Sequence, residues 1–250
     1  MNQIIQGLWI GPRLSVMEQL SISSFLANGH QYHLYVYDEV KNIPEGAVVK
    51  DGNRILPASM IFQYKDHKSH AGFSNYFRYK LLLEKGGWWA DTDIVCLRPF
   101  DFDSEYVFST ESSESGMVTT TGIIKCPVAS EVMFSAWEAC QKKEPEALVW
   151  GEVGPRLLAR LVKEFSLENH TKPYKVFCPF GFEDWEKVLD PKPMLYFDES
   201  TCAIHLWNEM WRRSGQDKDK SFHPDCLYER LKRKYLRLPP AQTVNSAVTE

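Results

Sequence analysis

The fold is decided by an apolar run near the start of the chain, Ile4-Ile5-Gln6-Gly7-Leu8-Trp9-Ile10, which Gly11-Pro12 ends. A short apolar run that a glycine and a proline end is typical of a buried strand. Apolar residues then recur at helical spacing over residues 17–26, and Asn28-Gly29 gives a stop signal. Residues 32–37 are aromatic and β-branched, as in a second strand. Strand, helix and strand in this order predict a βαβ unit, and with it an α/β fold on a parallel sheet.

Further elements extend this pattern. Helical periodicity returns over residues 73–85, and Gly86-Gly87 ends that helix, because glycine enters the left-handed conformation without steric cost. Residues 88–97 predict a strand that two aspartates interrupt. A short strand is expected at residues 47–50, and helices at residues 134–141 and 154–164. We therefore predict one Rossmann-type α/β domain with a mixed, mostly parallel sheet flanked by helices.

Bulk composition excludes several classes of protein. The 250 residues are 44% hydrophobic and 25% charged, which is normal for a globular chain. A net charge of −4 and a pI near 6.0 argue against a nucleic-acid binder, which needs a broad basic surface. Six widely spaced cysteines without a Cys-x-x-Cys pair are typical of a reduced cytoplasmic chain. No signal peptide is visible, and no apolar run approaches the ~20 residues that span a bilayer.

The pair Asp91 and Asp93 is the first candidate for chemistry. Two carboxylates at i and i+2 on a strand end face the same side and suit a divalent cation. Mg²⁺ and Mn²⁺ prefer carboxylate oxygens, and substrate phosphates often complete their coordination. Apolar residues flank the pair, and a buried charge requires a partner. The chain has no glycine-rich phosphate loop, so metal and side chains would have to hold a diphosphate. The alternative is a solvated turn that carries two acids.

Sequence around this pair resembles a known family. Ser74-Asn75-x-x-Arg78, followed by residues 86–93 (Gly-Gly-Trp-Trp-Ala-Asp-Thr-Asp), resembles the sugar-binding DXD region of GT-A glycosyltransferases. The most similar group joins bacterial polysaccharide and yeast mannosyl transferases with α-1,4-galactosyl- and α-1,4-N-acetylglucosaminyltransferases. Large clostridial glucosylating toxins share this region. The family pattern has aspartate and tyrosine where this chain has Asn75 and Trp89.

The resemblance implies a role for each of these side chains. It implies that Asp93 binds the metal and that Asp91 contacts the ribose or the donor sugar. It also implies that Ser74, Asn75 and Arg78 bind the donor, the last two by reading sugar hydroxyls. The planar guanidinium of Arg78 can donate to several oxygens at once. Taken alone, Arg78 could also be an exposed helix arginine.

Three other stretches are similar to the same family. Residues 5–11 resemble the opening strand whose Trp9-Ile10 end receives the nucleotide base, although Gln6 stands where a histidine is usual. Residues 154–160 resemble the Gly-Pro helix start of the α-1,4-transferases, which is also a generic start signal. Residues 203–211 resemble a His-x-Trp motif, which implies His205 as a third metal ligand and Trp211 as a cover for the diphosphate. Trp9 and His205 could each instead be ordinary core residues.

Four other polar residues carry weaker signals. His67 and His70 have a metal-like spacing but no matching second pair of ligands. Glu152 and Asp184 are candidate acceptor contacts, with solvated surface as the alternative for each.

The chain is expected to divide into three parts. We predict a GT-A-like catalytic domain over residues 1–211, a basic helical extension over 212–238 and a disordered tail over 239–250. The basic extension has two interpretations, a solvated helix or a patch that meets anionic lipid head groups.

The activity that the resemblance implies is retaining transfer of a hexose or N-acetylhexosamine from a UDP-sugar, with Mn²⁺ or Mg²⁺ as cofactor. The acceptor would be an oligosaccharide or lipid-linked glycan in bacterial surface polysaccharide synthesis, such as O-antigen, capsule or lipopolysaccharide. The enzyme would be cytoplasmic and peripheral on the inner face of the membrane. Two alternatives remain: transfer to a protein side chain, or a carbohydrate-binding relative without turnover, which Asn75 keeps open.

Overall fold

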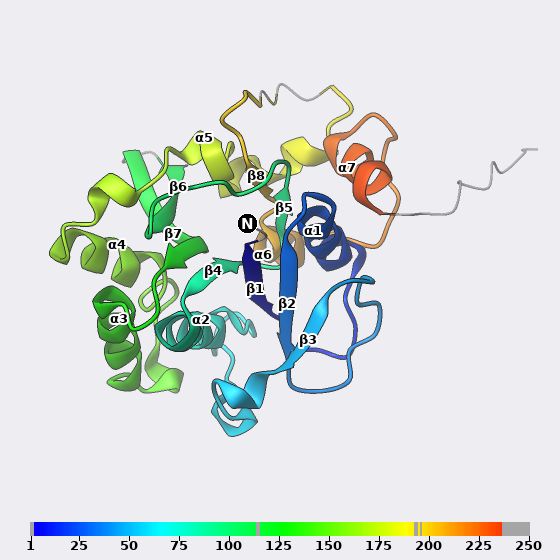
Figure 1. Ribbon diagram of the computed structural model, residues 1–250. Coiled ribbons are helices and arrows are strands. Elements are labelled where there is room, and N and C mark those ends of the chain that lie inside the picture. The colour runs from blue at the N-terminus through cyan, green and yellow to red at the C-terminus, as the bar shows by residue number, and fades with distance from the viewer. Residues whose placement is uncertain (1–2, 114–115, 193–194, 196, 237–250) are drawn as a thin grey trace, which may run out of the picture.

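A six-stranded mixed sheet forms the centre of the structure, a computed structural model that describes residues 3–113, 116–192, 195 and 197–236 (Figure 1). Its strands are β1 (Ile4–Leu8), β2 (Gln31–Val36), β3 (Val48–Asp51), β4 (Gly87–Ala90), β6 (Val107–Ser113) and β7 (Gly116–Cys126). Their spatial order is β3-β2-β1-β4-β7-β6. The pairs β1·β2, β2·β3 and β1·β4 are parallel, and β4·β7 and β6·β7 are antiparallel. The predicted mixed, mostly parallel sheet is confirmed.

The opening βαβ unit forms as predicted. Strand β1 leads into α1 (Val16–Ala27), which returns the chain to β2. Ser15 caps this helix with its hydroxyl oxygen, which accepts from the Met17 amide at 3.2 Å. Glu18 accepts from the Ser15 amide at 2.8 Å, which completes a capping box. The first turn of α1 is therefore fixed by its own sequence.

The strand order reverses between β1 and β4. Helix α2 (Ala71–Lys85) carries the chain to the other side of β1, where β4 adds in parallel. Gly86 ends this helix at φ 59°, and a Cβ there would lie 2.5 Å from the Val128 amide nitrogen. Only glycine fits this turn, as the sequence predicts. A reversal of order makes a crevice at the carboxyl ends of β1 and β4, where open α/β sheets bind ligands.

Residues 88–97 form two strands instead of the single interrupted one that the sequence predicts. Strand β4 ends at Ala90, and β5 (Ile94–Cys96) pairs antiparallel with β8 (Ala203–His205) in a separate two-stranded sheet. The two aspartates thus lie in the turn that joins the two sheets. The register sets Ile94 opposite His205, so the end of β8 arrives beside this turn.

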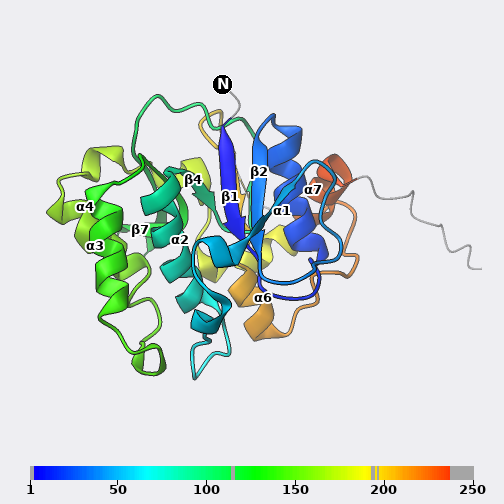
Figure 2. The same cartoon turned by 60° about the horizontal axis from the view of Figure 1, so that its bottom comes forward.

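Helices cover both faces of the sheet. Those not yet given are α3 (Glu131–Gln141), α4 (Pro155–Glu164), α5 (Tyr174–Phe177), α6 (Asn208–Ser214) and α7 (Leu227–Tyr235), with shorter 3₁₀ segments at Gly52–Arg54, Ala58–Met60, Pro145–Ala147, Glu168–His170 and Phe182–Leu189. Figures 1 and 2 show α2, α3 and α4 on one side and α1 and α7 on the other. Trp88 and Trp89 point to opposite faces of β4, and each joins one of the two cores.

The C-terminal part of the described chain packs on the rest. Helix α6 spans the boundary predicted after Trp211, and residues of α7 share an apolar cluster with Met17 and Leu20 of α1. The tail predicted at residues 239–250 lies outside the described residues. Across the described ranges, no helix combines the length and the apolar character that crossing a membrane requires. The division into domain, extension and tail stays a prediction.

Candidate functional site

The two aspartates and His205 gather at the crevice between β1 and β4. One ligand atom from each of Asp91, Asp93 and His205 lies within 4.8 Å of the other two. Nε2 of His205 lies 3.2 Å from Oδ2 of Asp93. Over the part of the chain that the structure describes, no other group of three His, Cys, Asp or Glu side chains lies this close. The structure therefore brings together three residues that the sequence separates widely.

Asp93 is held from both sides by the chain that follows β8. Its carboxylate Oδ2 accepts from the Asn208 amide at 2.8 Å, and its carbonyl accepts from the Leu206 amide at 2.9 Å. Trp207 lies between these two residues, and its indole stacks on the His205 ring with centroids 3.8 Å apart. The segment 205–208 thus orients both members of the pair.

Asp91 is only partly committed to other protein groups. Its Oδ1 accepts from Arg78 Nη2 at 3.0 Å and from Trp89 Nε1 at 2.9 Å. Its Oδ2 faces Gly122, where a Cβ would lie 3.7 Å from that oxygen and 3.7 Å from His205 Cε1. Glycine at position 122 therefore leaves space beside the cluster, and Asp91 Oδ2 is available to a ligand.

Arg78 is buried, so the alternative of an exposed helix arginine is wrong. Its side chain is 4% exposed and lies 4.8 Å over the Trp89 ring. Besides Asp91, it donates to Ser74 Oγ at 2.8 Å, to the Ser74 carbonyl at 3.2 Å and to the Thr121 carbonyl. The guanidinium thereby joins α2, β7 and the aspartate turn.

Burial and neighbouring charges shift the pKa values of Asp91, Asp93 and His205 in opposite directions. Burial raises the pKa of Asp91, although Arg78 beside it acts to lower it. Burial also acts to raise the pKa of Asp93, but His205 and the Asn208 amide outweigh it and hold that pKa below its usual range. The pKa of His205 lies well above its ordinary value, because the attraction of Asp93 outweighs desolvation. Asp93 and His205 are thus an ion pair in the metal-free chain.

The donor set fits a divalent cation. Two carboxylates supply oxygen ligands of the kind that Mg²⁺ and Mn²⁺ prefer, and imidazole is a ligand that transition metals accept. The ion would be held by the side chains of Asp93 and His205 and by Oδ2 of Asp91. The resemblance assigns the metal to Asp93 and His205 alone, and the geometry adds Asp91 as a third candidate ligand.

Asn75 lies between two helices at the predicted donor side. Its side chain is buried, and Oδ1 has no hydrogen-bond partner. A Cβ on Gly154, at the start of α4, would lie 2.9 Å from Asn75 Nδ2, so the Gly-Pro helix start contacts this amide closely. This oxygen is a buried acceptor without a partner, which is rare in folded proteins.

Trp9 and Ile10 follow β1 at the same edge of the sheet. The Trp9 amide continues the β2 ladder by donating to the Tyr35 carbonyl at 2.9 Å. The indole Nε1 of Trp9 is buried without a partner, and Ile10 packs partly against the core that α2 covers. Both are half-buried and remain candidates for contact with a nucleotide base.

Trp211 is not brought to the carboxylates. Its side chain is fully buried among Trp185, Phe222 and Tyr228, and its Nε1 donates to the Leu206 carbonyl at 2.8 Å. A buried indole offers no face to a diphosphate. Trp207, the tryptophan of the His-x-Trp motif, lies against His205 instead.

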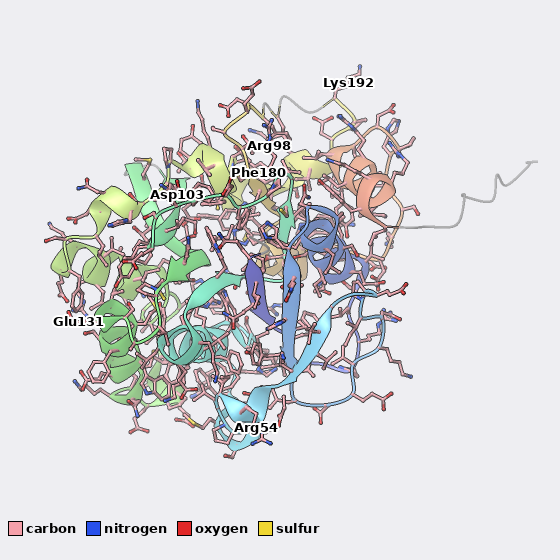
Figure 3. The ribbon with its side chains drawn as sticks, viewed as in Figure 1. Arg54, Arg98, Asp103, Glu131, Phe180 and Lys192 are labelled. Atoms are coloured by element: carbon pink, nitrogen blue, oxygen red, sulfur yellow. The ribbon has the colours of Figure 1, made fainter. Side chains whose placement is uncertain are left out.

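The two candidate acceptor residues lie apart from the cluster. Glu152, in the loop before α4, pairs with Lys143 at 2.5 Å. Asp184 pairs with Lys187 at 2.8 Å and lines a cavity of about 540 Å³ together with Phe180. Phe180, labelled in Figure 3, shares an apolar cluster with Ile204 of β8, and its carbonyl accepts from Trp207 Nε1 at 3.2 Å. The cavity wall thus contacts the residue that stacks on His205.

A family model matches part of the first half of the chain. Residues 15–112 match the family model described as "Glycosyltransferase sugar-binding region containing DXD motif". The matched residues include Asn75, Arg78, Asp91 and Asp93, whereas His205 lies beyond them.

The chain is also similar to one curated protein and to solved structures. A human alpha-1,4-N-acetylglucosaminyltransferase is 20% identical over 183 residues, which cover 64% of this chain and 51% of that protein. The chain thus spans about half the length of this relative. A structure of the PaToxG glycosyltransferase superposes with a TM-score of 0.52 at 16% identity, over 67% of this chain and 72% of that one. The glycosyltransferase domain from the YGT toxin gives a TM-score of 0.45 at 8% identity, over 95% and 94% of the two chains. The PaToxG comparison, with a TM-score above 0.5, supports the predicted GT-A-like fold.

Proposed function

Because residues 15–112 match the model of a glycosyltransferase sugar-binding region with a DXD motif, we propose that the protein is a metal-dependent glycosyltransferase that uses a UDP-sugar. The observation that carries this proposal is the cluster of Asp91, Asp93 and His205 at the crevice where the strand order reverses. Ligands of open α/β sheets bind in such crevices. The sugar transferred is proposed to be a hexose or an N-acetylhexosamine.

Each side chain at the crevice has a proposed task. Asp93 and His205, with Asp91 Oδ2, hold Mn²⁺ or Mg²⁺, which when bound supplies a Lewis acid for the diphosphate leaving group. Arg78 and the unpaired Asn75 Oδ1 orient the hydroxyls of the donor sugar. Arg78, Asp93 and His205 are buried and already held by hydrogen bonds, so little reorganisation of these three accompanies binding.

The base of the donor is assigned to the start of the βα connection. Trp9 and Ile10 follow β1, on the side of the crevice opposite to the aspartate turn. The half-buried Trp9 indole offers an apolar face to a uracil ring, whereas its unpaired Nε1 is buried. Ser74 supports the site indirectly, because its hydroxyl accepts from Arg78.

The acceptor is proposed to be an oligosaccharide or a lipid-linked glycan of a bacterial surface polysaccharide, and transfer to retain the anomeric configuration. Both proposals rest on the family resemblance. Glu152 and Asp184 stay proposed acceptor contacts, and Asp184 has the better support, because it lines the cavity next to Trp207. The similarity to the human alpha-1,4-N-acetylglucosaminyltransferase makes UDP-N-acetylglucosamine the first donor to test.

Contact with a membrane surface is proposed for α7. Arg212 and Arg213 both pair with Glu209, at 2.7 and 2.8 Å, which reduces the charge that they offer to lipid. Exposed basic residues of α7 remain for this role, namely Arg230, Arg233 and Lys234. A cytoplasmic enzyme at the inner face of the membrane would meet a lipid-linked acceptor there.

Calorimetry of UDP binding with and without Mn²⁺ tests the proposal. We expect UDP to bind the wild-type chain at least about tenfold more tightly with Mn²⁺, and Asp93→Asn to abolish this dependence. Asp225→Asn is the matched control, because Asp225 is an exposed acid with a side chain 75% accessible. UDP binding that is indifferent to Mn²⁺ in the wild type would refute the metal-dependent model.

A donor and acceptor screen then separates the remaining alternatives. Hydrolysis or transfer is measured with UDP-galactose, UDP-glucose and their N-acetyl forms, against glycans and against proteins. Transfer to proteins alone would replace the glycan acceptor with a protein side chain. Binding of UDP-sugars with neither hydrolysis nor transfer would identify a carbohydrate-binding relative.

A further inference from the structure

Lys218, on the segment between α6 and α7, lies next to the metal cluster. Its Nζ donates to Asn208 Oδ1 at 2.7 Å, and the Asn208 amide donates to Asp93 Oδ2 at 2.8 Å. Lys218 is also among the groups that lower the pKa of Asp93. The ammonium group of Lys218 is thus linked through Asn208 to Asp93, a candidate metal ligand.

Lys218 reaches the predicted base site as well. Its Nζ lies 5.8 Å from the centroid of the Trp9 ring. Trp9 is the residue proposed to meet the base, and Asp93 the residue proposed to hold the metal. In a nucleoside diphosphate sugar, the diphosphate connects the nucleoside to the sugar and is the part that a metal binds. A cation that lies near both Trp9 and Asp93 is therefore placed where a diphosphate would pass.

The segment that carries Lys218 is anchored to the first turn of α1. The carboxylate of Asp219 accepts from the Val16 amide at 2.7 Å and from Arg13 Nη2 at 2.7 Å. The Tyr228 hydroxyl donates to the Lys218 carbonyl at 2.9 Å. These three contacts, from α1, α7 and the loop before α1, hold residues 218–219 in place, so Lys218 is positioned before any ligand arrives.

The ammonium group has capacity for a ligand. It donates to Glu18 Oε1 at 2.5 Å and to Asn208, and an ammonium group has three donors. Glu18 is fully buried, whereas the Lys218 side chain is 20% exposed. One N–H and an accessible surface therefore remain for an anion from solvent.

We propose that Lys218 binds the diphosphate of the nucleotide donor. This inference rests on the proposed function, because it takes a nucleoside diphosphate as the ligand. It assigns Lys218 to the donor site rather than to the basic surface that could meet lipid. Glu18 and Asn208 then act as positioning residues, which hold the ammonium group in place through Oε1 and Oδ1.

The test compares UDP with uridine, which lacks the diphosphate, by calorimetry on the full chain with Mn²⁺. Lys218→Met is expected to weaken UDP binding by about 10- to 100-fold, as for loss of a charged hydrogen bond, and to leave uridine binding unchanged. Lys220→Met is the matched control, because Lys220 is an exposed lysine two residues away. Its affinity for UDP should equal that of the wild type.

A second variant separates binding from folding. Lys218→Met leaves Glu18 as a buried charge without its cation, which destabilises the chain. Adding Glu18→Gln removes that charge, so the double variant should recover thermal stability but still bind UDP weakly. Wild-type UDP affinity in the double variant would show that Lys218 only neutralises Glu18, and would overturn the inference.

The outcomes for this inference and for the proposed function are distinct. If the wild type binds UDP with Mn²⁺ and Lys218→Met binds it equally well, the inference fails and the function stands. If the wild type does not bind UDP at all, both fail.

Discussion

Arg78 Nη2 lies 3.0 Å from Asp91 Oδ1, in an ion pair that joins helix α2 to the turn between the two sheets. The same guanidinium donates to Ser74 on α2 and to the Thr121 carbonyl on β7. Arg78 therefore holds three elements in register around the crevice. It also keeps one oxygen of Asp91 occupied, which leaves the other for a ligand.

Replacing Arg78 should reduce both stability and donor binding. Arg78→Met leaves Asp91 and the Thr121 carbonyl without a buried partner, so the free energy of unfolding should fall by about 2–4 kcal/mol. Arg78→Lys should lose less stability than Arg78→Met but stay below the wild type, because an ammonium group lacks the planar fork of a guanidinium. Urea unfolding and UDP-sugar titration measure the two effects. Arg160→Met, at an exposed pair with Glu164, should change stability by less than about 0.5 kcal/mol.

Metal affinity should rise with pH. The pKa of His205 is raised, because Asp93 outweighs the desolvation that burial imposes. This pair therefore stabilises the metal-free fold below the unfolded pKa of about 6.5, and that contribution is lost as pH rises through the raised value. A cation must displace the proton from His205, so Mn²⁺ affinity should increase by up to about tenfold per pH unit below the raised pKa. Titration of Mn²⁺ between about pH 6 and pH 9 measures this.

The matched variant for this pH dependence is His205→Gln, which has no proton to displace. Its weaker Mn²⁺ affinity should vary much less over the same pH range. An equal slope in both proteins would mean that a group other than His205 competes with the metal.

Two glycines with positive φ should differ in their tolerance of alanine. Gly29 has φ 82° and nothing within 4 Å of a built Cβ, so Gly29→Ala should cost about 1 kcal/mol of unfolding free energy. Gly86 has φ 59° and a Cβ that would lie 2.5 Å from the Val128 amide nitrogen, so Gly86→Ala should cost at least about 3 kcal/mol. Equal losses of unfolding free energy for the two variants in urea would mean that the backbone at residues 127–128 shifts to accommodate the added Cβ.

Trp211 and Trp207 should show opposite phenotypes. Trp211→Phe empties part of the core and leaves the Leu206 carbonyl unpaired, so stability should fall by about 2–4 kcal/mol while UDP affinity of the folded chain stays within about twofold. Trp207→Leu removes the ring that stacks on His205, so Mn²⁺ and UDP affinity should fall more than stability. A selective loss of UDP affinity in Trp211→Phe would instead support the diphosphate contact that the resemblance implies.

Local periodicity predicts those helices and strands whose pattern is complete within a short stretch of sequence. The opening βαβ unit, helix α2 and its glycine end all follow from such windows. The hairpin of β6 and β7 was missed, because buried Thr119, Thr120 and Thr121 interrupt the apolar alternation of a strand. Residues 88–97 resembled one strand, because apolar residues flank the aspartates on both sides. Only the pairing with β8 separates them into two sheets.

Some residues of the candidate site can likewise be predicted from local sequence, and others cannot. Asp91 and Asp93 are two residues apart, so their proximity follows from the chain itself. His205 is 112 residues from Asp93, and no rule of local spacing predicts that they meet. Only the family resemblance implies His205 as a metal ligand. Within the His-x-Trp motif, tertiary packing decides which tryptophan meets the site. Trp207 precedes α6 in a left-handed conformation and stacks on His205, whereas Trp211, one helical turn later, points into the core.

The pairing of Asp93 with the segment 205–208 bears on how the protein is made. A ribosome has synthesised the whole matched region, residues 15–112, long before His205, Leu206 and Asn208 emerge. A nascent chain at that stage holds two aspartates but neither the imidazole nor the amides that orient Asp93. If the proposed function holds, the growing polypeptide should therefore gain its metal site and its activity only after the strand that ends in His205 has been translated.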